Sequence, residues 1–522
     1  MNGTMTEVLA GVDIGGTSVK VLVCDARGRK VCLQKSSTLP AYLGTDGKTP
    51  DTGPQRRFDG EKLWLITAQT IARAMKELPQ GCRLRSIAVS SCGCTVLLLD
   101  EKGEQIDFSV SPGELAREAA YYAGCFTNQE FCARTGYPLE ENNSGFHISA
   151  FCQREQGRRI AHVVSVDDYI AYRLSGEITR NYSTALSCGM WDWGERGWLS
   201  RFLMRTGLLE EQLGAPLESG TPIGPVCQTA LEEACLPDGV LVCTGGHDYE
   251  CAAFACHPLV EGNLFSITGT IDMLAFFQRG ELPEPMEECR HICDRHVMPG
   301  EHSSMIETLG AVQTEWLKNR VVADEQFGFA LGWDDYFSRL AGRYGADFRS
   351  TELFLPRVFG TYFPWVDRDS LGMYAGLSKD TDASALLLAT VEGMAFQTKK
   401  MAHVLKGDFS AQDAVVMVGG GSKDPTWLQV KADILGSRLI IPALPEASAT
   451  GAALLGGVGC KVFAGHREAA QACEGAIRQE VLPDPRRSAY FGEVYREVYL
   501  PLERTMNEFD KKRLQINQRY ER

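Results

Sequence analysis

A carboxylate inside a strand-like run is the first candidate for chemistry in this chain. Residues 8–25 read VLAGVDIGGTSVKVLVCD, where Asp13 stands among apolar residues shortly before a glycine pair. Because a buried, unpaired carboxylate is costly, Asp13 must have a partner or a task. Two glycines after a strand allow a tight turn whose exposed N–H groups can hold an anion. We expect this turn to bind phosphate through Gly15, Gly16, Thr17 and Lys20.

In that interpretation Asp13 faces a magnesium ion that bridges the phosphates, with water between the carboxylate and the ion. The alternative is a plain hairpin turn in which the aspartate is only a local cap. The motif alone leaves both open.

The stretch GGHDYECAAFA, residues 245–255, presents a second carboxylate. An apolar strand stops at two glycines and places His247 and Asp248 before a helix-like segment. Strand ends that open into a cleft are where α/β proteins place their chemistry. Aspartate is also a common helix cap, and the motif alone favours that role for Asp248.

Two further glycine turns follow. In SITGTIDML, residues 266–274, Gly269 and Thr270 repeat the backbone-plus-hydroxyl chemistry of the first turn. Two such turns could clamp a polyphosphate from both sides, although each is also compatible with an ordinary hairpin. The recurrence of strand, glycine–threonine turn and strand predicts a duplicated architecture with a cleft between the halves.

The fourth motif, VVMVGGGSKDPTWLQVKADILG at 415–436, runs from an apolar strand into three glycines. Asp424 and Pro425 then signal a helix start. Three consecutive glycines carry a large entropic cost unless their conformation is needed, so we expect exposed backbone that approaches a flat ring closely.

Composition narrows the class of protein. The chain has 522 residues, which favours two domains, and its net charge of −14 speaks against nucleic acid or an anionic membrane as a partner. The first residues lack the pattern of a signal peptide, and no apolar stretch is long enough for a membrane helix. The 18 cysteines are scattered mostly singly, which is typical of a reducing compartment, so we expect a cytoplasmic protein.

Strand-like and helix-like segments alternate along the chain, and this βαβα rhythm predicts an α/β fold. A stretch rich in proline and glycine, residues 213–226, is expected to be a loop. We place the domains at 7–249, 250–486 and 487–522, the last being a charged, peripheral helical tail.

Taken in order, these motifs resemble those of the FGGY carbohydrate kinases over about residues 8–460. The most specific match is GGGSKDPTWLQVKADILGSRLIIPALPEASATGAALLGGVG, residues 419–459. The segments LGMYAGLSKD at 371–380 and ATVEGMAF at 389–396 are similar to those just upstream in the family. The resemblance implies an α/β fold of two ribonuclease-H-like domains, the actin/Hsp70/sugar kinase fold, around a cleft for ATP and sugar.

The resemblance also implies roles for residues. Asp13 matches the magnesium-associated aspartate, and Asp248 falls where the family keeps its catalytic base, which overturns the cap as the favoured role. The two phosphate turns become Gly15, Gly16 and Thr17, and Gly269 and Thr270. The implied adenosine-binding residues are Gly310, Gly419, Gly420, Gly421, Ser422 and Asp424.

The sugar side departs from the family pattern. Many members carry Trp-x-Asp-x-Arg where this chain reads DFSVSPGELAREAAYYAG. Xylulose kinases have Met-His in place of Gly93 and Cys94, and Asn in place of Tyr249. These three residues, with Asp248, are the expected substrate-binding set.

The expected reaction is therefore ATP- and Mg²⁺-dependent phosphorylation of a hydroxyl on a small sugar or polyol, with a ketose as first choice. Two alternatives stay open: a kinase of a linear, polyol-like signal molecule, and a nucleotide-binding relative without catalysis. The resemblance further implies a homodimer.

Overall fold

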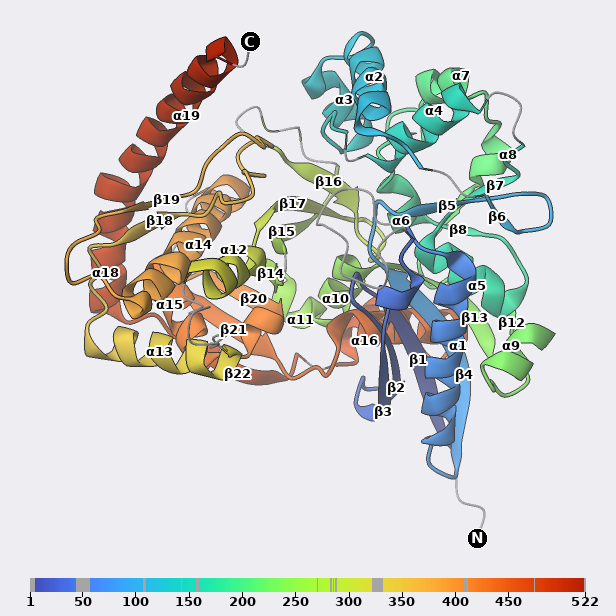
Figure 1. Ribbon diagram of the computed structural model, residues 1–522. Coiled ribbons are helices and arrows are strands. Elements are labelled where there is room, and N and C mark those ends of the chain that lie inside the picture. Colours follow the sequence, from blue (N-terminus) through green and yellow to red (C-terminus); the bar gives the residue numbers. More distant parts are fainter. Residues whose placement is uncertain are drawn as a thin grey trace.

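The computed structural model describes residues 5–43, 57–106, 109–141, 143–155, 159–269, 271–281, 284, 286, 289–321, 332–407, 409, 412–473 and 475–520. These residues form two α/β lobes, each built on its own central sheet (Figure 1). Within them, no helix has the length and apolar character that a membrane crossing requires.

The first sheet has six strands in the order β12-β13-β4-β1-β2-β3. A meander of three antiparallel strands, β1 (Thr6–Ile14), β2 (Ser18–Asp25) and β3 (Lys30–Ser37), forms one side. β4 (Cys82–Ser91) lies parallel to β1, and β13 (Leu241–His247) lies parallel to β4. Since β1, β4 and β13 all end at one edge, Asp13 and the residues that follow β13 come to the same edge of the sheet.

The second sheet repeats this plan in the order β16-β17-β15-β14-β20-β21-β22. Its meander consists of β14 (Leu264–Thr268), β15 (Ile271–Arg279) and β17 (Glu301–Leu309), and β16 is Ile292–Arg295. Strands β20 (Ala414–Gly419) and β21 (Arg438–Pro442) continue in parallel to β14, and β22 (Ile477–Val481) closes the edge. The duplicated strand–turn–strand architecture predicted from the sequence is confirmed.

Helices cover both sheets. On the first, α1 (Gly60–Lys76) packs on β2 and β3, and α5 (Val166–Ser175) packs on β4 and β13. On the second lobe, α14 (Ala383–Lys406) packs on α15 (Pro425–Leu435) and on α13 (Trp333–Ala346). The amphipathic pattern of α1 explains its place, because its buried side chains (Leu63, Trp64, Ala68 and Ile71) recur every three to four residues.

Two helices from later in the sequence lie against the first sheet. α10 (Asp248–Ala255) and α16 (Ala447–Gly459) pack on each other, and α16 also packs on β1, β4 and β13. Small residues make this contact possible: a Cβ on Gly451 would lie 1.8 Å from the carbonyl oxygen of Cys251. A Cβ on Gly11 would lie equally close, 1.8 Å from the carbonyl oxygen of Ala449. The small-residue helix predicted at 447–459 therefore joins the second half of the chain to the first sheet through close backbone contacts.

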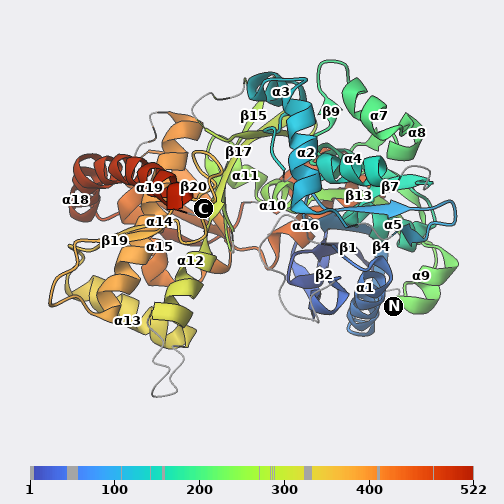
Figure 2. The same cartoon turned by 45° about the horizontal axis from the view of Figure 1, so that its top comes forward.

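A group of shorter elements sits above the first lobe (Figure 2). It has its own apolar core, which includes Tyr122, Phe131, Phe146 and Phe202. Its strands are β5 (Val96–Leu99), β6 (Gln105–Ile106), β7 (His162–Ser165), β8 (Arg180–Asn181), β9 (Trp191–Asp192), β10 (Gly197–Trp198) and β11 (Pro216–Leu217). Its helices are α2 (Pro112–Ala123), α3 (Asn128–Thr135), α4 (Ser144–Arg154), α6 (Tyr182–Leu186), α7 (Ser200–Thr206) and α8 (Glu210–Leu213).

The remaining elements complete the two lobes. They are α9 (Gln228–Glu233), α11 (His257–Val260), α12 (Ala311–Trp316), β18 (Leu353–Leu355), β19 (Met373–Ala375), α17 (His466–Gln471), α18 (Pro485–Val494) and α19 (Leu500–Tyr520).

Two expectations need correction. The stretch 213–226 is not all loop, because β12 (Pro222–Pro225) pairs antiparallel with the first residues of β13, Leu241 to Cys243. This is an edge strand, where proline is tolerated because its missing N–H faces outward. The tail is helical as predicted but less peripheral than expected, since Phe491 and Tyr499 are buried and Glu503 binds Arg357 at 3.1 Å. The domain boundaries stay a prediction.

Candidate active site

Asp13 lies at the end of β1 and is almost fully buried. Its carboxylate accepts hydrogen bonds from the Lys20 ammonium at 3.2 Å and from the Ser90 hydroxyl at 3.3 Å. Burial raises the pKa of Asp13 to about 6; the Lys20 ammonium opposes this, and the carboxylate of Asp248 adds to it. The strand register brings the two acids to the same end of the sheet, because Asp13 pairs with Ser90 and His247, which precedes Asp248, pairs with Ser91.

The first glycine turn links β1 to β2 and is closed by a hydrogen bond from the Gly15 N–H to the Ser18 carbonyl. Lys20 is not directed at a free anion here, because its ammonium also pairs with Glu446 at 3.2 Å. Asp13 and Glu446 together raise the pKa of Lys20, which keeps it positively charged. The turn is therefore flanked by a fixed cation next to the buried carboxylate.

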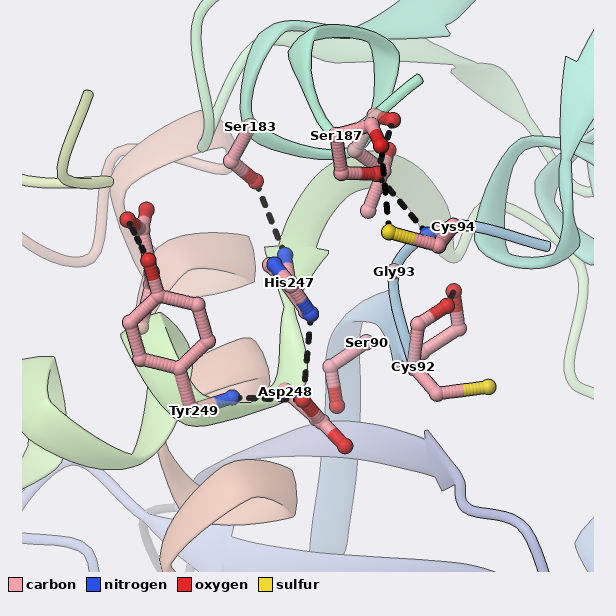
Figure 3. Close-up of polar contacts among 12 residues, drawn as sticks. Ser90, Cys92, Gly93, Cys94, Ser183, Ser187, His247, Asp248 and Tyr249 are labelled. Carbon is pink, nitrogen blue, oxygen red and sulfur yellow. Dashed lines mark hydrogen bonds and ion pairs between the residues drawn. The ribbon is translucent and has the colours of Figure 1, made fainter. Parts of the chain in front are cut away.

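Asp248 is the first residue of α10, and His247 precedes it as the residue at the helix cap position. The Asp248 carboxylate accepts from the neighbouring Tyr249 N–H at 2.7 Å and lies 3.6 Å from His247 Nε2 (Figure 3). A helix cap instead bonds the N–H two or three residues further on. About a third of the side chain is exposed (32%), so a substrate can reach the carboxylate.

His247 is the residue that the sequence interpretation quoted without assigning it a role. Its backbone N–H donates to Ser183 Oγ at 2.8 Å. Its ring packs against the Tyr249 ring, with 4.6 Å between the ring centroids. Burial lowers the pKa of His247 to about 4, so the ring is neutral at pH 7. Its Nδ1 atom has no hydrogen-bond partner within the described part of the chain. The sequence feature that could have indicated a role for His247 is the GGHD motif itself.

The neutral state of His247 predicts a pH dependence of stability. The folded protein binds fewer protons than the unfolded chain between about pH 4 and 6.5, so this histidine's contribution to stability falls as the pH drops from 7 to 5. We expect the unfolding free energy of the wild type, relative to a His247→Gln variant, to decrease by about 2 kcal/mol over that interval. Urea denaturation of both proteins at pH 7 and pH 5 measures this, and an unchanged difference would contradict it.

Gly93 and Cys94 lie on the His247 side of the site, and their part in substrate binding stays a prediction. A Cβ on Gly93 would lie 2.4 Å from His247 Cε1, so only glycine leaves room for the ring. Cys94 has a positive φ of 57° and its N–H donates to Ser187 Oγ at 3.0 Å. Cys94 is exposed on this side of the site, and its Sγ donates to the Ser187 carbonyl at 3.1 Å.

Tyr249 differs from the expectation. Its hydroxyl donates to Glu250 at 2.9 Å and contacts Ser303 at 2.8 Å, inside a buried network. Figure 3 shows the phenol ring turned away from Gly93 and Cys94. The structure thus brings the ring, but not the hydroxyl, next to His247, because the hydroxyl is satisfied elsewhere.

The second turn lies at the end of β14, where Gly269 stands; Thr270 is outside the described residues. Gly310 is brought directly against it, since a Cβ there would lie 2.6 Å from the Gly269 carbonyl oxygen. A buried ion pair that the sequence interpretation missed supports the turn: Lys431 lies 3.5 Å from Asp272. The sequence feature that could have indicated this ion pair is a lysine within the apolar helix segment WLQVKADIL.

The three-glycine loop follows β20 and packs on β14. Gly419 has a φ of +96°, and a Cβ on Gly421 would lie 2.3 Å from Thr268 Cγ2. The Ser422 hydroxyl donates to the Gly419 carbonyl at 2.8 Å. Gly420 has open space around it. The expected adenosine residues and the second turn therefore meet at one end of the second sheet.

Asp424 has a structural task in this loop. Its carboxylate accepts from the Trp427 N–H at 2.7 Å and caps α15. The same carboxylate was expected to bind adenosine, and the structure shows it holding the start of the helix.

Comparison with known protein families identifies the class of protein to which this site belongs. The chain matches the models of the FGGY family of carbohydrate kinases, with the N-terminal domain over residues 8–255 and the C-terminal domain over residues 334–460. The protein belongs to this family and is a carbohydrate kinase, as the sequence motifs predicted.

Among curated relatives, the chain is similar to an autoinducer-2 kinase of Yersinia enterocolitica serotype O:8 / biotype 1B, at 25% identity over 483 residues and 88% of each chain. Among solved structures, xylulose kinase from Rhodospirillum rubrum matches with a TM-score of 0.80 at 21% identity, covering 97% of this chain and 100% of that one. Plasmodium falciparum glycerol kinase with ADP matches with a TM-score of 0.78 at 15% identity, covering 96% and 98%. The structural matches confirm the predicted two-domain fold.

Proposed function

We propose that this kinase transfers the γ-phosphoryl group of ATP to a hydroxyl of a small sugar or polyol, with Asp248 as the general base. The observation that carries the proposal is the position of Asp248: it is partly exposed directly after β13, beside His247, and at the same end of the first sheet as the buried Asp13. A neutral His247 matters because a cation there would hold the carboxylate and weaken it as a base.

In the reaction, the substrate hydroxyl gives its proton to Asp248 while its oxygen attacks the γ-phosphorus in line, and the bond to ADP breaks. In this proposal the turn at Gly16 and the exposed Thr17 face the phosphates, and Lys20, held by Asp13 and Glu446, contributes positive charge beside them. On the second lobe, the turn at Gly269 and the loop at Gly419 supply backbone for the rest of the nucleotide.

The donor set around Asp13 fits magnesium. A carboxylate oxygen is a preferred ligand of Mg²⁺, and oxygens of ATP and water would supply the other ligands. No group of three or more His, Cys, Asp or Glu side chains in the described residues forms a metal cage of its own. Asp13 would hold the ion with the phosphates, and the ion would neutralise phosphate charge when bound.

A linear, polyol-like signal molecule is the second candidate acceptor. Similarity to autoinducer-2 kinases over 88% of both chains favours it. At Gly93 and Cys94 this chain also lacks the Met and His side chains of xylulose kinases. The acceptor site is therefore compatible with a molecule whose shape differs from that of a pentulose.

The test is ADP release with MgATP and a panel of ketoses, polyols, aldonates and a linear dihydroxyketone. Acceptor-dependent release supports the proposal, and the acceptor with the highest kcat/KM decides between the two candidates. No release with any acceptor, from protein that binds ATP, would contradict it.

Gly93 offers a sharper probe of the sugar side. A Gly93→Ala variant places a methyl group 2.4 Å from His247 Cε1, so the ring must move next to the base. We expect kcat/KM for the acceptor to fall by about 10- to 100-fold, because a displacement near 1 Å in an active site has effects of this size. The KM for ATP should change little. Gly113→Ala is the matched control, since a Cβ there meets nothing within 4 Å. Normal acceptor kinetics in Gly93→Ala would contradict the packing.

A further inference from the structure

A second cavity, of about 730 Å³, lies between the two lobes and contains none of the candidate catalytic or nucleotide residues. One wall is the turn 27–30 that joins β2 to β3 in the first sheet. The opposite wall is the segment 442–445 that leaves β21, together with Arg478 on β22. Both lobes therefore contribute to it.

The cavity is separate from the phosphate turn. Gly15–Thr17 precede β2, whereas the turn 27–30 follows it, and β2 is eight residues long. At about 3.3 Å per residue the two ends of this strand are roughly 25 Å apart. A ligand in the cavity cannot be the transferred phosphate.

The lining combines positive charge with an apolar wall. Arg27, Arg29, Lys30 and Arg478 face apolar groups from Pro442, Ala443, Leu444, Pro445, Ala472 and Ala476. Arg29 is neutralised by Asp25, which its Nε contacts at 2.7 Å, so we assign the excess positive charge to Lys30 and Arg478.

The cationic turn is rigid. The Asp25 carboxylate accepts from the backbone N–H groups of Arg27 at 2.9 Å and Arg29 at 3.0 Å. Gly28 has a φ of +71°, and a Cβ there would lie 2.5 Å from Cys473 Sγ. The backbone of the turn is thus held against the second wall.

Arg478 connects the cavity to the nucleotide side. Its guanidinium donates to the Ser422 carbonyl at 2.8 Å, in the loop expected to bind adenosine. A guanidinium has five N–H donors, so the same side chain can hold an anion while it holds this loop.

The segment 442–445 makes a second connection. It leads directly into α16, the helix that packs on the first sheet and on α10. A ligand that touches this segment and the turn 27–30 therefore contacts both lobes.

We propose that this cavity is a second binding site, for a small molecule that carries an anionic group such as a phosphate on an apolar body. Its occupancy is coupled through Arg478 and the segment 442–445 to the nucleotide site. The coupling rests on the proposed function, whereas the binding does not.

The probe is phenyl phosphate, with benzyl alcohol as an uncharged analogue. Binding is measured by calorimetry on the full chain, both without nucleotide and with saturating Mg²⁺ and a non-hydrolysable ATP analogue. The variants are Lys30→Gln and Arg478→Gln, with Lys379→Gln as a control at an exposed lysine outside the cavity.

We expect phenyl phosphate to bind the nucleotide-loaded protein, benzyl alcohol not to bind, and Lys30→Gln to lower the affinity at least 10-fold while Lys379→Gln does not. In kinetics, phenyl phosphate should shift the wild-type KM for ATP at least 3-fold and leave that of Lys30→Gln unchanged. Arg478→Gln should retain part of the binding and lose the shift.

Absence of binding to the nucleotide-loaded protein, or equal binding by Lys30→Gln, would overturn the site. Binding without a KM shift would overturn only the coupling. An inactive kinase that still binds phenyl phosphate through Lys30 would leave the site standing and contradict the proposed function alone.

Discussion

Replacing Asp248 by asparagine is expected to lower kcat by about 10³-fold, within the range that positioned general bases contribute. Asparagine keeps the size and the hydrogen bond to the Tyr249 N–H but cannot accept the substrate proton. The side chain is partly exposed and stands at the first position of α10, so we expect the variant to fold. Steady-state ADP release at saturating acceptor measures the effect.

The control is Asp59→Asn, which makes the same chemical change at the start of α1, where Asp59 accepts from the Lys62 N–H. Affinity for the ATP analogue should be largely unchanged in both variants, because Asp248 is assigned to the acceptor hydroxyl. Near-normal turnover in Asp248→Asn would remove Asp248 from the role of base. Loss of ATP binding together with turnover would assign it to the nucleotide instead.

The second large effect concerns stability. A Gly451→Ala variant is expected to lower the free energy of unfolding by about 3 kcal/mol, at the upper end of overpacking costs. The added methyl group would lie 1.8 Å from the Cys251 carbonyl oxygen, and backbone cannot yield as a flexible side chain can. Helix propensity works in the other direction, since alanine favours a helix over glycine by about 1 kcal/mol.

Gly342→Ala in α13 is the matched control, because this helix glycine is exposed and a Cβ there meets nothing within 4 Å. It should be neutral or stabilising by up to about 1 kcal/mol. Urea unfolding curves of the two variants give the comparison. If Gly451→Ala were as stable as Gly342→Ala, the close contact of α16 with α10 would be wrong.

Local patterns were sufficient to predict most of the fold. Alternating apolar runs around glycine turns predicted β1, β2, β14 and β15, and the duplicated meander followed from their recurrence. What the sequence did not reveal was the packing of α16 on the first sheet, because its partner strand β1 is more than 400 residues away in the chain. The edge strand β12 was missed because proline and glycine normally signal loops.

For the candidate site, too, some residues could be predicted from the sequence and others could not. The motifs singled out Asp13, Asp248 and the glycine turns, since each stands at a strand end with an unusual residue type, but only the family resemblance assigned Asp248 the role of base. Lys431 and the neutral state of His247 could not be predicted, because both depend on burial by distant segments. The sequence did indicate a helix start at Asp424, but the family resemblance assigned this residue to adenosine binding. The homodimer and the cytoplasmic location stay predictions.

The most direct test of the central claim is the stoichiometry of the reaction in one vessel. Wild-type protein and Asp248→Asn are incubated with MgATP and the best acceptor of the panel, and ADP and phosphorylated acceptor are quantified together by mass spectrometry. The account predicts one phosphorylated acceptor per ADP in the wild type, and about 10³-fold less of both in the variant. ADP formed without phosphorylated acceptor, or equal product from both proteins, would contradict it.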